Sequence, residues 1–264
     1  MNEQVKNLRI DILRLSERCR DGNLQSAFSC VDTIWVLYDK IMNWSPEKSI
    51  DEYRDFFIIS KGQATLALYA VLIKKGMFQW QEVCEEIGEF DSKYCIQTDL
   101  TKFQGGIENN AGSLGHGLPF AVGIAYANKI KGLNSKTYVL CGDGEFCEGS
   151  MWEACIFAAS NHLNNLCVII DDNESVGAMV EMGSFEDKFR AFGFRVIVTD
   201  GHDCDALETV FMTLDTNMLD KPTIVIAKTI RGYGSHTMMK NDIWFHKAPD
   251  NQELSMLIKE VEIF

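Results

Sequence analysis

Two segments decide the fold: residues 137–145, Thr-Tyr-Val-Leu-Cys-Gly-Asp-Gly-Glu, and residues 166–173, Leu-Cys-Val-Ile-Ile-Asp-Asp-Asn. Each is an apolar run that ends in polar residues, and a helical pattern over 151–159 separates them. Strand, glycine turn, helix and strand in this order predict two neighbouring parallel strands. Asp143 and Asn173 would then meet at the carboxyl edge of the sheet, where ligands bind. Their oxygens, with small glycines beside them, suit a hard cation that carries a diphosphate.

Composition limits the class of protein. The chain has 264 residues, 46% hydrophobic and 24% charged, which is an ordinary globular balance. Its net charge of −13 argues against a nucleic-acid partner. No stretch approaches the roughly 18 apolar residues of a membrane span, and no signal peptide is visible. The nine cysteines form no Cys-x-x-Cys pair, which indicates reduced thiols rather than a zinc site. We therefore expect a cytoplasmic protein that binds neither nucleic acid nor membrane.

Apolar periodicity predicts the secondary structure. Helices are expected at 5–19, 32–42, 64–75, 79–88 and 117–131, and a long loop should lead from 89 to 112. Strands are expected at 55–60, 137–141, 166–171, 195–199 and 223–228. Strands that alternate with helices predict an α/β fold, with one parallel sheet and helices on both faces. No interior linker or repeat is visible, so residues 1–264 should form a single domain.

Several motifs, in order over nearly the whole chain, resemble the N-terminal, thiamine diphosphate-binding domain of transketolase. They are Phe28-Ser29-Cys30-Val31-Asp32 at the start of its first helix, Ser60-Lys61-Gly62, Gly112-Ser113-Leu114-Gly115-His116-Gly117, Gly142-Asp143-Gly144-Glu145 with Glu148-Gly149 and Trp152-Glu153-Ala154, Asp200-Gly201-His202-Asp203 with Lys221-Pro222-Thr223, and Trp244-Phe245-His246 with Lys247-Ala248-Pro249. A lone Gly-Asp-Gly is a weak signal, whereas six ordered matches at the right spacing are a specific one.

The resemblance implies that the chain binds thiamine diphosphate with Mg²⁺, or with another divalent cation such as Ca²⁺ or Mn²⁺. By that resemblance the metal ligands are Asp143, Asn173 and the backbone carbonyl of Ser175. Three oxygen ligands of this kind suit a hard cation. The implied cofactor-binding residues are Gly112, Leu114, Gly142, Asp143, Gly144, Glu148, Asn173, Ile230 and His246. Lys228 and Arg231 are further candidates for binding the phosphates, with solvated charges at the strand ends as the alternative.

The implied catalytic residues are His246, His116 and Gln63. Gln63 stands where the family has a histidine, and so do Asn23 and, in the loop before Gly112, a position near Thr98. Carboxamides form hydrogen bonds but take no proton near neutral pH. The departures favour a donor or acceptor other than the pentose and hexose phosphates of central metabolism. A weakly active subunit is the alternative interpretation.

The resemblance also implies a second chain that completes the enzyme. The pyrimidine-binding and C-terminal domains of a transketolase have no counterpart in this chain. We therefore expect a split enzyme, active only with a partner subunit that carries both domains, and two copies of each chain. It would transfer a two-carbon ketol unit from a ketose to an aldose acceptor, with sugars or sugar phosphates as substrates.

Other interpretations stay open. The chain can be an α-type subunit of a 2-oxo acid dehydrogenase or of a pyruvate-using synthase, or a cofactor-binding scaffold without turnover. Asp143 and Asn173 are also residue types that cap helices after strands. His202 is expected to order the turn after a strand. Trp152 is expected to anchor a contact between subunits.

Overall fold

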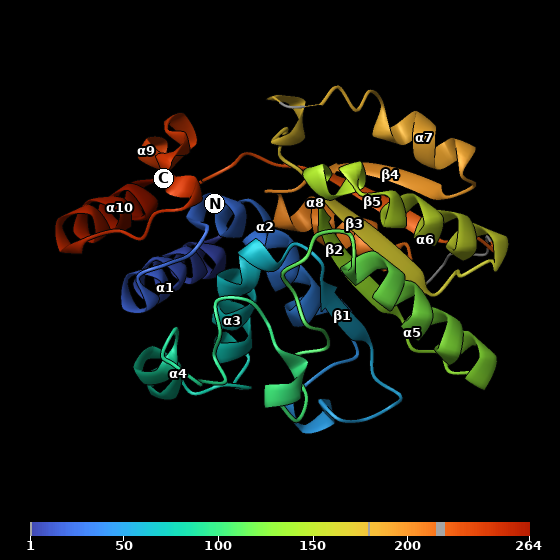
Figure 1. Cartoon of the computed structure of the whole chain (residues 1–264), viewed down its shortest axis with the longest axis horizontal. Helices are drawn as coiled ribbons and strands as arrows, with labels where there is room; N and C mark the ends of the chain where they lie inside the picture. Colours follow the sequence, from blue (N-terminus) through green and yellow to red (C-terminus); the bar gives the residue numbers. More distant parts are fainter. Residues whose placement is uncertain (1, 179, 215–219) are drawn as a thin grey trace.

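A parallel sheet of five strands lies at the centre of the molecule (Figure 1). The computed structural model describes residues 2–178, 180–214 and 220–264. The strands are β1 (Phe56–Ile59), β2 (Thr137–Gly142), β3 (Leu166–Asp172), β4 (Arg195–Asp200) and β5 (Thr223–Lys228). They pair in the order β1-β2-β3-β5-β4, and every pair is parallel. All five therefore end at one edge, and β2 and β3 are neighbours as predicted.

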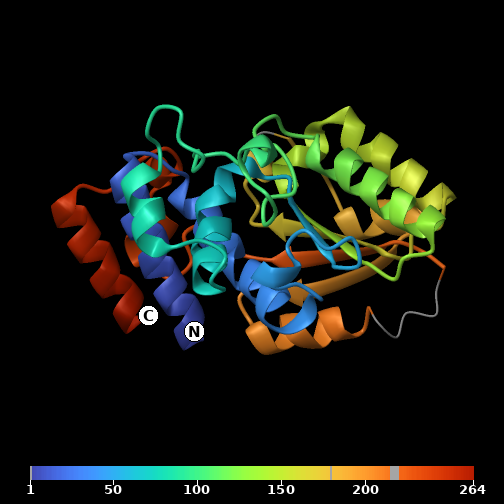
Figure 2. The same cartoon turned by 90° about the horizontal axis from the view of Figure 1, so that it is seen from below.

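The strand side chains alternate between two hydrophobic cores. On β2, Tyr138 and Leu140 belong to one core, whereas Val139 and Cys141 belong to the other. The first core is covered by α2 (Leu24–Val36), α3 (Thr65–Lys74) and α8 (Cys204–Met212), and the second by α5 (Gly117–Lys131), α6 (Gly149–Ser160) and α7 (Phe185–Ala191). Figure 2 shows the green helices α5 and α6 on one side of the sheet and the orange α8 on the other. The predicted α/β fold with helices on both faces is confirmed.

The remaining helices extend one end of the molecule. Helix α1 (Glu3–Cys19) packs between α3 and α10 (Asn251–Ile263), so the two ends of the chain lie close together (Figures 1 and 2). Helix α4 (Trp80–Glu86) also contacts α1, and the short α9 (His236–Lys240) precedes α10. The predicted strands, and the helices predicted at 5–19, 64–75, 79–88 and 117–131, lie within two residues of the observed bounds. Helices α7 to α10 were not predicted.

The predicted start of the second helix at residue 32 was wrong. Helix α2 begins at Leu24, where Asn23 caps it by accepting a 3.1 Å hydrogen bond from the Ser26 amide. Every residue of α2 is buried, the polar Gln25, Ser26 and Ser29 included, so the polar residues before Asp32 do not mark a loop that precedes the helix. Residues Leu37–Ile41 continue it as one π-helical turn. The segment Phe28–Asp32 therefore lies inside the helix rather than at its start.

A buried ion pair joins α1 to α2. The Arg9 guanidinium lies 2.5 Å from the Asp32 carboxylate, and both side chains are fully buried. Arg9 also donates to the carbonyls of Phe28 and Tyr233. Burial opposes the charge on Asp32, but the guanidinium and a hydrogen bond from His202 hold the pKa of this carboxyl below its ordinary value. Since both charges have partners, removing one would leave the other buried and unpaired.

No helix in the described ranges is both long and apolar enough to cross a membrane. The nine cysteines are free thiols, and four of them are buried: Cys30, Cys141, Cys155 and Cys167. Burial raises the pKa of Cys30 and of Cys167 to about 12. Such thiols pack as small apolar side chains and are poor nucleophiles.

The Arg9–Asp32 pair predicts an acid-sensitive contribution to stability. We expect Asp32→Asn to lower the free energy of unfolding at pH 7 by about 3–5 kcal/mol, because Arg9 loses its buried partner. A carboxyl whose folded pKa is depressed stabilises above its unfolded pKa, near 3.8, and stops doing so as the pH falls through the folded value. Urea titrations should therefore show a constant difference in the free energy of unfolding between Asp32→Asn and wild type from pH 7 to about 4.5. This difference should become smaller below about pH 4.

Asp11→Asn is the matched control for this prediction. Asp11 pairs with Arg14 at 3.5 Å on the partly exposed side of α1, the helix that carries Arg9. Its loss should cost less than about 1 kcal/mol. The role given to Asp32 would be contradicted if both variants lost the same free energy of unfolding. It would also be contradicted if the difference between Asp32→Asn and wild type did not become smaller in acid.

Candidate cofactor site

A cavity of about 420 Å³ opens at the carboxyl ends of β2 and β3. A volume of this size accommodates a small-molecule cofactor. Its wall is formed by Ser26, Lys61, Gln63, Leu114, Gly142, Asp143, Gly144, Glu145, Asn173, Ser175, Arg231, Asp242 and Phe245. These residues come from the ends of β1, β2, β3 and β5, from α2 and from the segment before α10. The cavity therefore lies where a parallel sheet binds its ligands.

Asp143 connects the ends of the two central strands. It follows β2 directly, and its carboxylate is buried. Its Oδ1 accepts hydrogen bonds from the Ser175 hydroxyl at 2.6 Å and from the Gly144 amide at 2.8 Å, and its Oδ2 accepts one from the Val176 amide at 3.1 Å. The loop after β3 is thereby folded back onto the loop after β2. The structure brings together all three predicted metal ligands, Asp143, Asn173 and Ser175.

Asn173 is oriented by a buried carboxylate. Its Nδ2 donates to Asp171 Oδ2 at 3.1 Å, and its Oδ1 accepts from the Ser175 amide at 3.1 Å. Since the amide nitrogen is committed to Asp171, the amide oxygen is the atom turned toward the Ser175 loop. An oxygen held in this way is the donor that a hard cation requires.

Asp171 is the centre of this polar network. Its Oδ2 accepts hydrogen bonds from the Lys61 ammonium and, at 2.6 Å, from the Ser29 hydroxyl, while Oδ1 accepts from the Thr229 hydroxyl at 2.5 Å. Lys61 is fully buried, and it also donates to the Ser26 carbonyl at 3.2 Å. Burial opposes the charge on Lys61, but the carboxylate of Asp171 holds the pKa of this ammonium above its ordinary value. Lys61 is therefore a fixed cation in the cavity wall.

A second buried carboxylate holds the neighbouring loops together. Glu145 accepts hydrogen bonds from the Ser60 hydroxyl at 2.7 Å and from the amides of Gly115 at 3.1 Å and Gly142 at 2.9 Å. Burial raises the pKa of Glu145 above its ordinary value, although these donors oppose the shift. A Cβ on Gly117 would lie 2.4 Å from the Ser60 Cβ, so only glycine permits this approach. The loop at 112–117 is thus tied to both strand ends.

The residues present fit a divalent cation with a diphosphate. One carboxylate, one side-chain amide oxygen and one main-chain carbonyl are hard oxygen donors of the kind that Mg²⁺ and Ca²⁺ prefer. A Cβ on Gly144 would meet no atom within 4 Å, and a Cβ on Gly142 would approach only Lys61. Both backbones therefore border open space, which a phosphate group can approach closely. Among the described residues no group of three or more His, Cys, Asp or Glu side chains could hold a metal ion.

Seven of the predicted site residues line this cavity: Gln63, Leu114, Gly142, Asp143, Gly144, Asn173 and Ser175. Five others do not: Gly112, His116, Glu148, Ile230 and His246. Both histidines are exposed; His246 follows the lining residue Phe245, and His116 precedes α5. The cavity is also lined by residues that the sequence patterns did not single out, among them Ser26 and Asp242. No local motif marks these two, because they reach the cavity from α2 and from a loop far along the chain.

The loop before Gly112 presents Gln97 rather than Thr98. The Thr98 side chain is buried and its hydroxyl donates to the Asn109 carbonyl at 2.8 Å. Gln97 is exposed, and its Oε1 would lie 2.5 Å from a Cβ on Gly112. The position aligned near Thr98 is therefore structural, and the neighbouring carboxamide is the side chain next to the glycine loop. Asn23, the third departure, is buried and caps α2.

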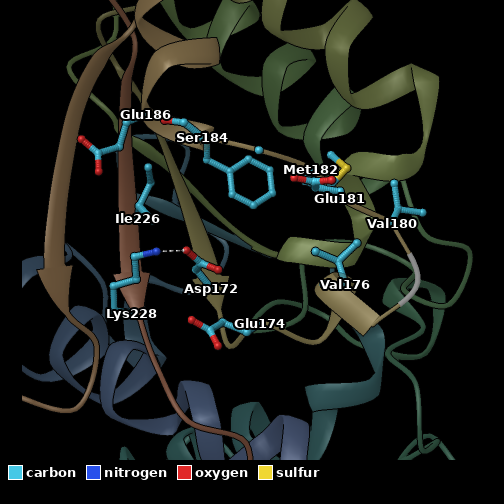
Figure 3. Close-up of a pocket in the computed structure, with 13 residues that line it drawn as sticks. Asp172, Glu174, Val176, Val180, Glu181, Met182, Ser184, Glu186, Ile226 and Lys228 are labelled. Atoms are coloured by element: carbon cyan, nitrogen blue, oxygen red, sulfur yellow. Dashed lines mark hydrogen bonds and ion pairs between the residues drawn. The ribbon is translucent and has the colours of Figure 1, made fainter.

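Lys228 is less suited to a phosphate in this cavity than Arg231. It lies in a neighbouring cavity of about 470 Å³, where its ammonium is 2.5 Å from Asp172 (Figure 3). Glu174 and Glu186 line the same cavity, so Lys228 is paired with one carboxylate in a cavity that carries further acidic side chains. Arg231 lines the cavity of Asp143 and forms only a partly exposed pair with Asp242, at 3.1 Å. Exposed pairs are weak and exchange partners readily.

A doubly covered parallel sheet, with mixed oxygen donors and open glycines at its carboxyl edge, defines a diphosphate-binding α/β domain. The chain matches the family described as "Transketolase, thiamine diphosphate binding domain" over residues 1–260. It therefore belongs to the transketolase family as an N-terminal, thiamine diphosphate-binding subunit.

Known relatives include short chains of similar length. The chain is 34% identical over 264 residues to a protein of Phocaeicola vulgatus that is named as one subunit of apulose-4-phosphate transketolase, covering 98% of this chain and 92% of the relative. It is 33% identical over 268 residues to the protein of the same name in Actinobacillus succinogenes, covering 99% and 96%. Transketolase of Pichia stipitis, solved with sedoheptulose 7-phosphate, superposes with a TM-score of 0.90 at 22% identity. That match covers 98% of this chain but only 40% of the yeast chain, and it shows the shared fold.

The Lys61–Asp171 pair generates a test of the network. We expect Lys61→Met to lower the free energy of unfolding, without any cofactor, by about 3–5 kcal/mol, because Asp171 would stay buried without its cation. The double variant Lys61→Met, Asp171→Asn should recover most of that loss, since the unpaired charge is removed. Urea unfolding measures both. A single variant within about 1 kcal/mol of wild type would show that the pair does not organise the strand ends.

Proposed function

We propose that this chain is the cofactor-binding half of a two-chain transketolase that moves a two-carbon ketol unit from a ketose to an aldose. The observation that carries the proposal is the meeting of Asp143, Asn173 and Ser175 in one cavity beside open glycines. Family membership supports it, as do the two relatives that are named as one subunit of a transketolase. In bound form, thiamine diphosphate supplies the chemistry that breaks a carbon–carbon bond beside a carbonyl.

In this proposal the chain's own residues grip the cofactor's diphosphate. Asp143, Asn173 and the Ser175 carbonyl hold a divalent cation, Mg²⁺ in the first instance. The Gly142 and Gly144 backbones border the phosphates, and Arg231 adds positive charge. Leu114, which is 37% exposed in the cavity wall, offers an apolar surface to the cofactor rings. Gly112, Glu148, Ile230 and His246 lie outside this wall and would act only at the edge of the site.

Three polar side chains are proposed for the substrate. Gln63 lines the cavity and can hold a substrate hydroxyl as donor or acceptor, without taking its proton. His116 and His246 are exposed near the cavity, and an imidazole can donate a hydrogen bond to a substrate or accept one from it. We propose that both reach the substrate once a partner covers the rim. A ketose phosphate is the first donor to test, because two relatives are named for apulose 4-phosphate.

The proposed partner carries the pyrimidine-binding and C-terminal domains. Large apolar side chains border the open cavity: Leu114 and Phe245 are each 37% exposed and Ile243 is 56% exposed. A rim of this kind is suited to burial against another chain. A second exposed apolar face lies on α5 and α6, where Tyr126 and Phe157 pack edge to face and Phe120, Ile130 and Ile156 are exposed. We propose that this face serves the contact between two copies of this chain, in an assembly that holds two copies of each chain in the cytoplasm.

Trp152 does not belong to that exposed face. Its ring stacks on Phe189 and Phe192, and its Nε1 donates to the Phe146 carbonyl at 2.9 Å. It therefore joins α6 to α7 and is only half-buried, and the expectation that this residue anchors a contact between subunits stays a prediction. Phe157, about one and a half turns further along α6, is the exposed aromatic side chain of this helix.

The metal assignment is tested by Asp143→Ala. We expect this variant to lose Mg²⁺-dependent binding of thiamine diphosphate in the assembled complex, because the only carboxylate among the three ligands is removed. Calorimetric titration with and without Mg²⁺ measures it. Glu174→Gln is the matched control: this neighbouring carboxylate faces the other cavity and should be replaceable without effect. Unchanged binding by Asp143→Ala would defeat the assignment.

The division of the enzyme between two chains is tested by reconstitution. We expect the chain alone, with thiamine diphosphate and Mg²⁺, to consume no ketose phosphate, and a mixture with its C-terminal partner to transfer the ketol unit to an aldose. Loss of the donor and formation of the longer ketose are followed by chromatography. Full turnover by the chain alone would refute the split. An assembled pair that binds the cofactor but consumes none of a panel of ketoses would instead be a binding subunit.

A further inference from the structure

The His202 ring bridges two parts of the chain that the cofactor site does not otherwise explain. His202 lies in the turn after β4, and its side chain is 6% exposed. Its Nδ1 is 3.2 Å from Asp32 Oδ2, on the buried helix α2. Its Nε2 accepts a hydrogen bond of 2.9 Å from the Ile230 amide, in the segment after β5. One imidazole thus connects the charged interior to the residue before Arg231.

The two hydrogen bonds determine the tautomer of the ring. Nε2 receives an N–H from the backbone, so it must present a lone pair and carry no proton. The proton of the neutral ring is then on Nδ1, where it is donated to Asp32. A doubly protonated ring would set an N–H against the Ile230 N–H and break the second bond. The geometry therefore requires a neutral His202 with its proton on Nδ1.

The surroundings hold the ring in this orientation. The Tyr233 ring stacks on it, with centroids 3.7 Å apart and an interplanar angle of 11°. Asp32 is in turn held by Arg9, whose Nε donates to the Tyr233 carbonyl at 2.8 Å. Asp200 fixes the backbone of His202 by accepting from its amide at 2.8 Å. The imidazole is therefore constrained at both ring nitrogens, at one face and at its backbone.

The segment that His202 contacts forms part of the cofactor cavity. Thr229 donates its hydroxyl to Asp171, and the Gly232 amide donates to the Gln25 carbonyl at 3.1 Å. Between these two anchors, Ile230 is held through its amide by His202, and Arg231 extends into the cavity wall. Without the hydrogen bond from the Ile230 amide to His202, Ile230 and Arg231 would lose the main-chain bond that links them to the interior.

We propose that His202 is a positioning residue: through the Ile230 amide it sets the backbone from which Arg231 reaches the cofactor's diphosphate. It touches neither cofactor nor substrate. The rigid Arg9–Asp32 pair orients the imidazole, and the imidazole orients the segment. The role of Arg231 rests on the proposed function, whereas the linkage through His202 stands on the geometry alone.

The first test is the tautomer in the full chain without cofactor. Nitrogen-15 NMR of histidine-labelled protein at pH 7.5 should show His202 with a protonated Nδ1 and a bare Nε2, assigned by its loss in His202→Phe. A ring protonated on Nε2, or on both nitrogens, would overturn the proposal. This measurement does not depend on any cofactor, partner or activity.

The second test separates positioning from packing. His202→Phe keeps a ring on Tyr233 but removes both hydrogen bonds, and His202→Gln retains a donor and an acceptor. We expect hydrogen exchange at the Ile230 amide to become at least about tenfold faster in the Phe variant, with partial recovery in the Gln variant. The Gly232 amide, held by Gln25, should stay within about twofold of wild type. Equal acceleration at both amides would mean that His202 only supports packing.

The third test links the segment to the cofactor. In the assembled complex, His202→Phe should weaken Mg²⁺-dependent binding of thiamine diphosphate about threefold to tenfold, as expected for one lost hydrogen bond. Combined with Arg231→Met it should weaken binding no further than Arg231→Met does, because both act through the same contact. Additive effects would overturn the route through Arg231. Arg231→Met can leave cofactor binding unchanged while the NMR and exchange results are as expected. In that case the contact of Arg231 with the cofactor is wrong, and the positioning of Ile230 by His202 stands.

Discussion

The rest of the structure depends on one buried carboxylate. Asp171, at the end of β3, accepts hydrogen bonds from Lys61 after β1, Ser29 on α2, Asn173 after β3 and Thr229 after β5. A carboxylate in the interior is costly unless it is neutralised and fully hydrogen-bonded, and here Lys61 and the hydroxyls meet both conditions. Because its partners come from four segments, this carboxylate can be buried with its hydrogen bonds formed only when all four segments are in their folded positions. The cofactor cavity is formed by the same contacts.

The buried charged side chains near the cofactor cavity have partners inside the protein, so the open surface of the cavity is available to ligands. Lys61 with Asp171 and Arg9 with Asp32 are closed ion pairs, and Glu145 is satisfied by a hydroxyl and two amides. Such groups hold loops in place but have little capacity left for a ligand. The groups that face the open cavity are the main chain of Gly142 and Gly144, the oxygens of Asp143, Asn173 and Ser175, and the half-buried Arg231. This separation of supporting groups from ligand-facing groups is what gives a binding site a fixed geometry.

The elements that the sequence predicted well are those whose pattern is local. The strands at 137–142 and 166–172 are uninterrupted apolar runs, and α5 has a glycine on either side, so their bounds follow from neighbouring residues. Helix α2 begins eight residues earlier than predicted, and the polar residues in its first two turns are buried rather than part of an exposed loop. Helices α7 to α9 have nine residues or fewer, too short for a period to stand out.

The sequence by itself determined the fold class and the family, and it predicted that Asp143 and Asn173 meet, because strand-end motifs depend only on chain order and on the rule that parallel strands end together. Tertiary structure alone decided which candidates share a cavity. It brought Gln63, Leu114 and Arg231 to Asp143, left His116 and His246 outside the wall, put Gln97 in place of Thr98 beside Gly112, and paired Lys228 with Asp172. These outcomes depend on side-chain direction and on partners up to about 200 residues away, as between Gln25 and Gly232. No spacing in the sequence encodes them.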